Sequence, residues 1–185
     1  MLVSLSKNFI FIHIPKTGGN SVNRVLQQYA VIPPRTLLEC HIPASVMRSC
    51  IRDYNTYFSF SFVRNPFDRL VSLYYFSRKH RAFPATFKEY VELVYRGDYP
   101  KSPDQYSKLY NPCGKLLVDF VGKFENIQHD FTHVCNKIGI QPVALPKANA
   151  TKHPDYKDCY TPELVKYVGE LYADDLETFG YEWKD

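Results

Sequence analysis

The chain has 185 residues, of which 45% are apolar and 23% are charged. These fractions are typical of globular proteins and exclude a disordered chain, and the length fits a single domain over residues 1–185. The formal net charge of +4 suits a small anionic ligand but is too small to indicate a nucleic-acid partner. Because no stretch approaches the ~18 apolar residues that a membrane-spanning helix needs, we expect no membrane span.

The cysteine pattern predicts a reduced, cytoplasmic protein without a structural metal. The five cysteines are an odd number at irregular spacing, and no two of them form a Cys-x-x-Cys pair. Such a pattern fits free thiols better than a disulfide framework or a zinc site. The N-terminus does not read as a signal peptide, because Lys7 interrupts its apolar part and no small-residue cleavage site follows.

The first predicted elements are a buried strand, a glycine-containing turn and a helix. Residues 8–14 are almost continuously apolar, which is typical of a strand inside a parallel sheet. The turn over residues 15–21 contains Gly18 and Gly19. Apolar side chains then recur at helical spacing over residues 22–29, so a helix follows the turn.

The same order recurs farther along the chain. Residues 57–63 alternate like a strand. Asn65, Pro66 and Asp68 suit the cap, the first position and the first turn of the helix that follows. Residues 86–97 predict a further helix, because they begin with a capping box and end on a glycine.

The remaining elements complete an alternating pattern. We expect a long loop over 99–114, a strand over 116–124, a helix over 131–138, an irregular segment over 142–160 and a last helix from Thr161 through Tyr172. Strands that alternate with helices predict an α/β fold with a mostly parallel central sheet. Ligands of such sheets bind beyond the carboxyl ends of the strands, where both turns described above lie.

The first turn has the composition of an anion-binding loop. In Pro15-Lys16-Thr17-Gly18-Gly19-Asn20-Ser21, the glycines let backbone N–H groups approach an anion, and the next helix offers its positive N-terminus. Lys16 adds a full charge, and Thr17 and Ser21 add hydroxyl donors. The loop is not a Walker A motif, which places its lysine after the glycines. The alternative is a plain strand-to-helix turn with a solvated lysine.

The second turn offers a guanidinium for a second anion. Arg64 ends one strand and precedes a helix N-terminus, where it can bind a phosphate in a bidentate manner, and Ser72 lies about two turns into that helix. The alternative is an ordinary capped helix with surface arginines, in which Arg69 pairs with Asp68 or Asp53. Two anion sites at the ends of neighbouring strands suit a ligand with two separate anionic groups.

Together these motifs resemble those of a known enzyme family. Residues 11–21 are similar to the 5′-phosphosulfate loop of sulfotransferases that use 3′-phosphoadenosine 5′-phosphosulfate (PAPS), and residues 62–72 are similar to their 3′-phosphate motif. The resemblance is to the carbohydrate branch, which includes heparan sulfate 2-O-sulfotransferases and short bacterial relatives. A weaker similarity covers residues 124–131 and 172–181. The resemblance implies a P-loop-like three-layer α/β sandwich.

The resemblance also implies a role for each residue of the two motifs. The residues implied to hold the 5′-phosphosulfate are Lys16, Thr17, Gly18, Gly19, Asn20 and Ser21. Arg64 and Ser72 would hold the 3′-phosphate, and Lys152 lies in a late loop that closes over the nucleotide in this family. PAPS would be the co-substrate, and a hydroxyl of a carbohydrate or other small-molecule or glycan acceptor would receive the sulfuryl group, with no metal required.

Sulfuryl transfer to an alcohol also needs a base for the hydroxyl proton. A neutral histidine fits this role near pH 7, and His41 matches the place of a histidine that the carbohydrate branch carries ahead of its second motif. Glu39 is the alternative base, since some relatives use a carboxylate. Lys16 would act with the base by stabilising charge on the transferred group. His13, inside the first strand, fits a core histidine with a backbone partner.

Two other function classes compete with this interpretation. An ATP-dependent small-molecule kinase would share the fold, but Lys16 is misplaced for it, and the nearest candidate for a Mg²⁺ ligand is Asp119, inside the third predicted strand. A non-catalytic relative that binds anionic glycans would use the same scaffold. The intact composition of the first loop argues against this second alternative.

Overall fold

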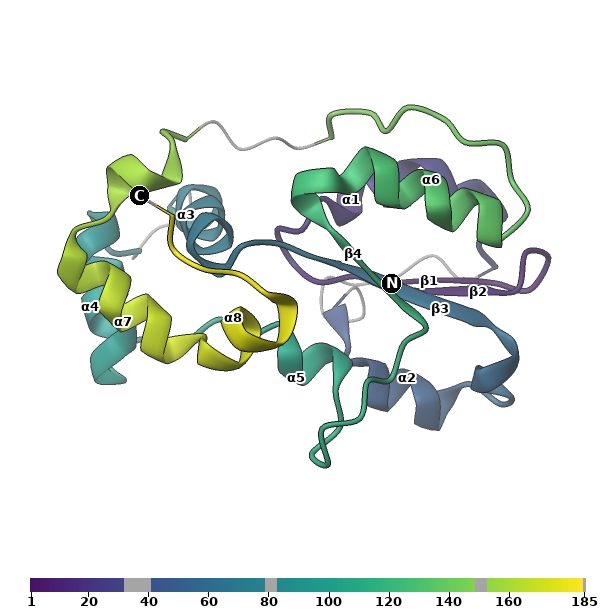
Figure 1. The fold of residues 1–185 in the computed structure, drawn as a ribbon, viewed down its shortest axis with the longest axis horizontal. Helices are drawn as coiled ribbons and strands as arrows, with labels where there is room; N and C mark the ends of the chain where they lie inside the picture. Colours follow the sequence, from purple (N-terminus) through teal and green to yellow (C-terminus); the bar gives the residue numbers. More distant parts are fainter. Residues whose placement is uncertain (32–40, 79–82, 149–152, 185) are drawn as a thin grey trace. The chain divides into compact units, whose positions relative to one another are not determined.

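A computed structural model describes most of the chain in two compact units (Figure 1). The described residues are 1–31, 41–78, 83–148 and 153–184. The first unit comprises residues 1–63 and 107–149, and the second comprises residues 64–106 and 150–185. The chain therefore passes between the units three times, and each unit is assembled from two separate segments.

The first unit is built on a four-stranded sheet of order β1-β2-β3-β4. Its strands are β1 (Leu2–Ser4), β2 (Phe9–Ile12), β3 (Phe58–Val63) and β4 (Phe120–Lys123). β1 pairs antiparallel with β2, whereas β2, β3 and β4 run parallel to one another. The predicted mostly parallel sheet is therefore confirmed, and the short antiparallel strand β1 is an addition that the sequence did not suggest.

Phenylalanine side chains form one face of this sheet. Phe9 and Phe11 on β2 and Phe60 and Phe62 on β3 are fully buried, and the rings of Phe11 and Phe60 stack with centroids 5.1 Å apart. Because side chains alternate along a strand, residues two apart share a face. This face packs against α1 (Gly19–Leu26) and α6 (Ile127–Lys137), whose buried residues belong to the same cluster.

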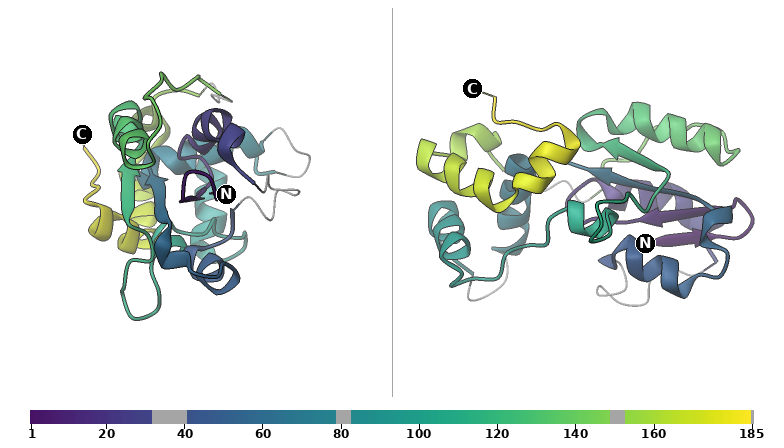
Figure 2. Two further views of the ribbon diagram at one scale, coloured as in Figure 1. Left: turned by 90° about the vertical axis from the view of Figure 1, so that its right-hand side faces the viewer. Right: turned by 60° about the horizontal axis from the view of Figure 1, so that its bottom comes forward.

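Helices cover both faces of the sheet and make the three layers that we expected. Figure 1 shows α1 and α6 on one side of the strands and α2 (Ala44–Cys50) on the other, and the two views of Figure 2 agree. The sequence did not predict α2. The other short elements are α5 (Tyr106–Leu109) and 3₁₀ turns over Gln27–Tyr29, Tyr54–Thr56, Phe124–Asn126 and Tyr156–Cys159.

The strand expected over residues 116–124 is shorter than predicted. Leu116 forms only an isolated bridge with Tyr110, and the ladder with β3 begins where Phe120 pairs with Phe60. Just before it, the carboxylate of Asp119 accepts the N–H of Ser59 at 2.8 Å. A side chain therefore takes the place that a backbone carbonyl would hold in a regular ladder.

The second unit consists of helices around an aromatic core. Its helices are α3 (Pro66–Ser77), α4 (Phe87–Arg96), α7 (Pro162–Leu171) and α8 (Ala173–Phe179). The predicted caps are confirmed: side chains of Asn65, Thr86 and Thr161 accept N–H groups of the first turns of α3, α4 and α7. The last helix was predicted to continue through Tyr172, but the chain leaves helical geometry there and starts α8.

The described residues can be compared with the expectations for membrane-spanning helices and for cysteines. Within the described ranges, no helix has both the length and the apolar character to cross a bilayer. Cys50, Cys113, Cys135 and Cys159 are free thiols. Cys40 lies outside the described residues.

Candidate functional site

The loop between β2 and α1 has two residues in left-handed backbone conformations. Lys16 has φ 68° and Gly18 has φ 82°. This conformation costs little for glycine but is uncommon for lysine, and such strained residues concentrate at functional sites. Left-handed residues in a tight loop bring successive N–H groups onto one concave side, which is an arrangement that binds anions.

The N-terminus of α1 lacks the side chains that normally cap a helix. Its N-cap residue is Gly18, no side chain within the described ranges accepts a first-turn N–H, and the first turn contains no acidic residue. The first N–H groups of a helix have no intrahelical acceptor, and the helix dipole places partial positive charge there. An anion bound at this terminus would supply the missing acceptor.

Both glycines of the loop are also required by close packing. A Cβ on Gly19 would lie 2.0 Å from Cδ2 of His13, and a Cβ on Gly18 would lie 2.5 Å from Cδ1 of Ile127. Real Cβ atoms do not approach other atoms so closely. The backbone of the loop therefore lies directly against His13, one residue past the end of β2, and against α6, at a distance that only glycine allows.

The two hydroxyl side chains of the loop do different things. Thr17 is fully buried and donates to the carbonyl of Ile14 at 2.9 Å, so its hydroxyl closes the loop internally. Ser21 accepts the N–H of Ala148 at 3.3 Å, which leaves its own proton available for another acceptor. Asn20 is exposed and Lys16 is partly exposed at the surface of the loop. Of the predicted donors, Ser21 and not Thr17 has a hydroxyl suited to an external anion.

His41 is fixed in one tautomer by the strand that leads to the loop. Its Nδ1 lies 3.0 Å from the carbonyl oxygen of His13. Because a carbonyl only accepts, Nδ1 carries the proton and the lone pair of the neutral ring is on Nε2. Lys108 donates to the backbone carbonyl of His41 at 2.8 Å and holds the main chain there. No motif in the sequence pointed to this lysine.

His13 is the buried partner of both the loop and His41. Its ring lies 4.6 Å from the ring of His41, nearly perpendicular to it, and only 6% of His13 is exposed. Burial, with the charges of the N-terminus and of His41 adding, lowers the pKa of His13 to about 3. The ring is therefore neutral near pH 7. Its Nδ1 contacts the side-chain amide of Asn23 at 3.4 Å and not a backbone group, which corrects the sequence-based expectation.

In the second unit, Arg64 is held by a carboxylate of the helix that follows it. Its Nε donates to Asp68 at 2.7 Å and its Nη2 lies 2.7 Å from the same oxygen. Arg64 is 7% exposed, and Ser72, farther along α3, is 3% exposed. Arg69 donates to the carbonyl of Pro103 at 3.0 Å. Asp68 thus orients Arg64, whereas the alternative interpretation of the sequence paired it with Arg69.

Three other residues were singled out in the sequence, as an alternative base, a nucleotide contact and a candidate metal ligand. Glu39 and Lys152 lie outside the described residues. Asp119, the nearest candidate for a Mg²⁺ ligand in a kinase, uses one oxygen to accept both the N–H and the hydroxyl of Ser59. Over the described parts of the chain, no group of three or more His, Cys, Asp or Glu side chains is placed to hold a metal ion.

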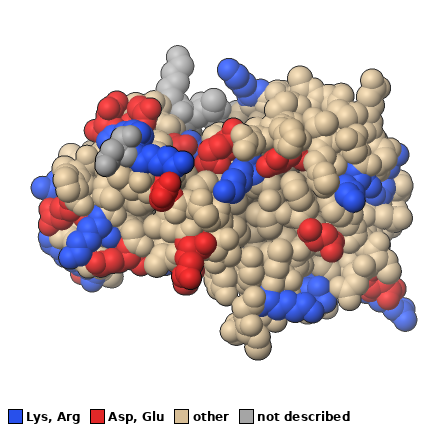
Figure 3. All heavy atoms as spheres, in the orientation of Figure 1, with Lys and Arg blue, Asp and Glu red and all other residues tan. Residues whose placement is uncertain are grey.

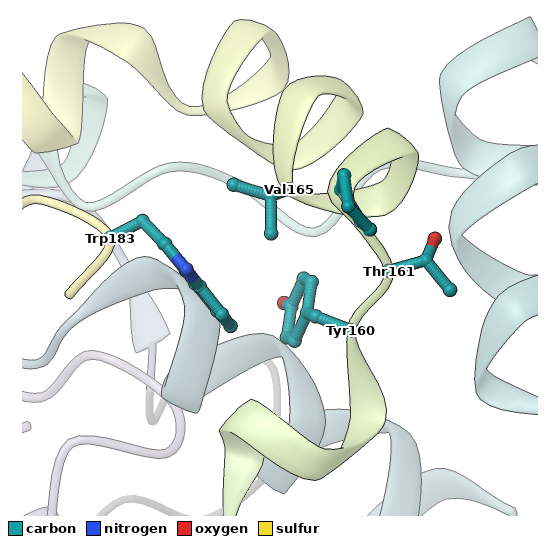
Figure 4. Close-up of a pocket in the computed structure, with 5 residues that line it drawn as sticks. Tyr160, Thr161, Val165 and Trp183 are labelled. Carbon is teal, nitrogen blue, oxygen red and sulfur yellow. The ribbon is translucent and has the colours of Figure 1, made fainter. Parts of the chain in front are cut away.

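A pocket in the second unit involves none of the predicted site residues. It has a volume of about 380 Å³ and is lined by Tyr160, Thr161, Pro162, Val165 and Trp183. Figure 4 shows the rings of Tyr160 and Trp183 beside this space. The hydroxyl of Tyr160 donates to the carbonyl of Phe67 at 3.0 Å, so the polar end of that ring serves the packing of α3.

Charged side chains are mixed in sign over the surface. On the face drawn in Figure 3, basic and acidic groups of the described residues are interspersed. This agrees with the small net charge of the chain.

Comparison with known proteins gives one consistent result. A sequence profile described as the sulfotransferase family matches residues 1–182. The chain is 23% identical over 231 residues to carbohydrate sulfotransferase 14 of Danio rerio, which covers 98% of this chain and 62% of that protein. The human protein of the same name is 25% identical over 224 residues, covering 98% and 60%. The chain thus spans less than two thirds of the length of these relatives.

A shorter relative and two solved structures complete the comparison. An uncharacterised protein of Archaeoglobus fulgidus is 30% identical over 119 residues, which are 63% of this chain and 98% of that one. Mouse sulfotransferase SULT7A1, crystallised with PAP, has a TM-score of 0.61 at 14% identity and covers 95% of this chain and 86% of its own. A sulfotransferase from Alicyclobacillus acidocaldarius has a TM-score of 0.50 at 17% identity and covers 95% and 96%. The structures establish the similarity of fold.

Substitution of Gly19 tests the close packing of the loop. Gly19→Ala would place a methyl group within the ring of His13, and overpacking of this kind costs about 1–3 kcal/mol. We expect a thermal unfolding midpoint that is lower by roughly 2–4 °C per kcal/mol for a chain of this size.

Gly169→Ala is the matched control for this substitution. Gly169 lies inside α7, where an added Cβ would have no atom within 4 Å, and alanine in a helix is favoured over glycine by about 0.5–1 kcal/mol. Its midpoint should stay the same or rise. A Gly19→Ala protein as stable as the Gly169→Ala protein would contradict the packing described here.

Proposed function

Because the chain belongs to the sulfotransferase family, we propose that it transfers the sulfuryl group of PAPS to a hydroxyl of a carbohydrate acceptor. Membership confirms the enzyme class that the two motifs predicted, and the fold is the one expected of that family. The carbohydrate acceptor is supported by the similarity to carbohydrate sulfotransferase 14. The location in the cytoplasm stays a prediction from the cysteine pattern.

The observation that carries the proposal is the set of hydrogen-bond donors at the start of α1. Among the described residues no side chain caps this terminus, its first turn has no acidic residue, and Lys16 precedes it in a left-handed conformation. Uncapped N–H groups and a lysine favour a ligand that carries several acceptor oxygens. The 5′-phosphosulfate of PAPS is such a ligand.

Each residue of the loop has a distinct part in this proposal. Lys16 neutralises charge on the bridging oxygen of the phosphosulfate, and the N–H groups of residues 18–20 bind its oxygens. The N–H of Ser21 donates instead to the carbonyl of Gly18 at 2.9 Å. Ser21 adds a hydroxyl donor. Asn20 lies in the first turn of α1 and would contact the same anion. Thr17 shapes the loop through its bond to Ile14 and contributes its main chain.

The second motif supplies the charge for the 3′-phosphate. A guanidinium carries five N–H donors, so Arg64 can keep its ion pair with Asp68 and also bind a phosphate. Ser72 on α3 would add a hydroxyl. Lys152 stays a predicted additional contact. We propose that residues 1–185 act as a single sulfotransferase domain.

His41 acts as the general base. Its Nε2 takes the proton of the acceptor hydroxyl while the acceptor oxygen forms a bond to sulfur and the bond from sulfur to the 5′-phosphate oxygen breaks. The electron pair of the broken bond stays on that phosphate, and the products are a sulfate ester and 3′,5′-ADP. The hydrogen bond from Nδ1 to the carbonyl of His13 keeps the lone pair on Nε2.

Nucleotide selectivity tests the proposed donor against the competing kinase function. We expect 3′,5′-ADP to bind with a Kd in the micromolar range in isothermal titration calorimetry, and Mg-ATP to bind at least about tenfold more weakly, a difference of about 1.4 kcal/mol. Lys16→Ala should weaken the binding of 3′,5′-ADP. Preferential binding of Mg-ATP would replace the sulfotransferase assignment with the kinase.

Substitution of His41 tests the base. His41→Ala should lower kcat by about 10²–10⁴-fold in a steady-state assay with radiolabelled PAPS, because general-base catalysis contributes this much. Its affinity for 3′,5′-ADP should stay close to that of the unmodified protein.

His129→Ala is the matched control, since the side chain of His129 is 87% exposed. It should retain full turnover. If His41→Ala also retains turnover and Glu39→Gln does not, the base is Glu39.

A further inference from the structure

The second unit contains a buried polar cluster that the sequence motifs did not include. Gln105 and Asp175 are both 0% exposed. A glutamine and a carboxylate are rarely buried completely, because an unsatisfied polar group in the interior is costly. The side chain of Gln105 hydrogen-bonds both to Asp175 and to the main chain of Arg64.

Gln105 brackets the main chain of Arg64. Its Oε1 accepts the N–H of Arg64 at 2.8 Å, and its Nε2 donates to the carbonyl of Arg64 at 2.9 Å. One side chain thus satisfies both backbone polar groups of one residue, as a neighbouring strand would. Gln105 thus fixes the main-chain end of the arginine, while Asp68 fixes its guanidinium through a hydrogen bond of 2.7 Å from Nε.

Asp175 in turn fixes Gln105. Its Oδ1 accepts the N–H groups of Gln105 and Tyr106, each at 2.7 Å, and its Oδ2 accepts from the N–H of Gln105 at 3.0 Å and from Nε2 of Gln105 at 3.1 Å. The last contact decides the orientation of the amide, because a carboxylate accepts from Nε2 and not from Oε1. Burial raises the pKa of Asp175, and the N–H donors of Gln105 and Tyr106 oppose that shift.

This arrangement fixes a geometry as well as adding stability. Replacing Gln105 by an apolar side chain would leave the buried N–H and carbonyl of Arg64 without the partners that Gln105 supplies, which lowers the free energy of unfolding. An apolar side chain could fill the space of Gln105, but it could not hold the backbone of Arg64 at both of its polar groups. A fully satisfied network instead specifies one geometry.

We propose that Gln105 is a positioning residue for the 3′-phosphate site, that it acts by fixing the main chain of Arg64, and that Asp175 holds it in place. The proposal rests on the proposed role of Arg64 in binding the 3′-phosphate. It adds two residues, from a loop and from α8, to a function that the motif over residues 62–72 carried alone.

The test compares two ligands that differ only in the 3′-phosphate, 3′,5′-ADP and 5′-AMP. The ratio of the Kd of 5′-AMP to the Kd of 3′,5′-ADP reports what the 3′-phosphate contributes to binding. The Kd of 5′-AMP is measured by displacement calorimetry. Gln105→Met keeps the volume and loses the hydrogen bonds. We expect it to reduce the ratio by about tenfold or more, as the loss of an oriented charge-assisted contact would, with the Kd of 5′-AMP changed less than about twofold.

Arg64→Ala is the reference variant, and Tyr74→Phe is the control. Arg64→Ala should reduce the ratio at least as far, and the double variant should show little further loss, because both act on one contact. Tyr74→Phe removes a partly buried hydrogen bond of 2.7 Å to the carbonyl of Ala85 in the same unit. It should lower the unfolding midpoint and leave the ratio unchanged, which separates positioning from stability.

The outcomes separate failure of this proposal from failure of the site. If Arg64→Ala reduces the ratio and a folded Gln105→Met protein does not, Gln105 is only structural and the positioning role is wrong. If Arg64→Ala also leaves the ratio unchanged, the 3′-phosphate assignment itself is wrong. Should Gln105→Met fail to fold by circular dichroism, Asp175→Asn replaces it under the same criterion, since it disturbs the orientation of the amide while preserving the volume.

Discussion

The close approach between Gly19 and the ring of His13 is the contact on which the first unit depends. It brings the start of α1 against the residue that follows β2, at a distance that excludes any side chain, so the N–H groups of the loop lie at the end of that strand. His13 also receives the hydrogen bond from His41 through its carbonyl. One buried residue therefore sets the distance between the anion loop and the proposed base.

A comparable constraint governs the second unit, with polar contacts in place of close packing. Arg64 is the first residue of that unit, and Gln105 and Tyr106 are the last before the chain returns to the first. A hydrogen bond between Gln105 and Arg64 joins these two ends of the segment, and a hydrogen bond from Gln105 to Asp175 joins them to α8. The segments that make up the unit are thus joined next to the residue that the sequence singled out for phosphate binding.

Local patterns in the sequence predicted what local interactions decide. The sequence predicted the strand before the first loop and the caps Asn65 and Thr86, because strand burial and helix capping depend on nearby residues. The short strand β1, helix α2 and the break at Tyr172 were missed, since tertiary pairing and packing create them. Gln105 gave no signal, because its partners Arg64 and Asp175 are 41 and 70 residues away along the chain.

The two proposed anion elements use different physics, and the difference would suit the two ends of PAPS. Backbone dipoles at the start of α1 are fixed by packing, so they would not need to reorganise as charge moves from the sulfuryl group to the bridging oxygen during the proposed transfer. The 3′-phosphate would not change during the reaction and would need only a stable counter-charge, which in our proposal is Arg64, held in one orientation by Asp68 and Gln105. In this proposal, rigidity of the loop serves catalysis, and rigidity of Arg64 serves selection of the nucleotide.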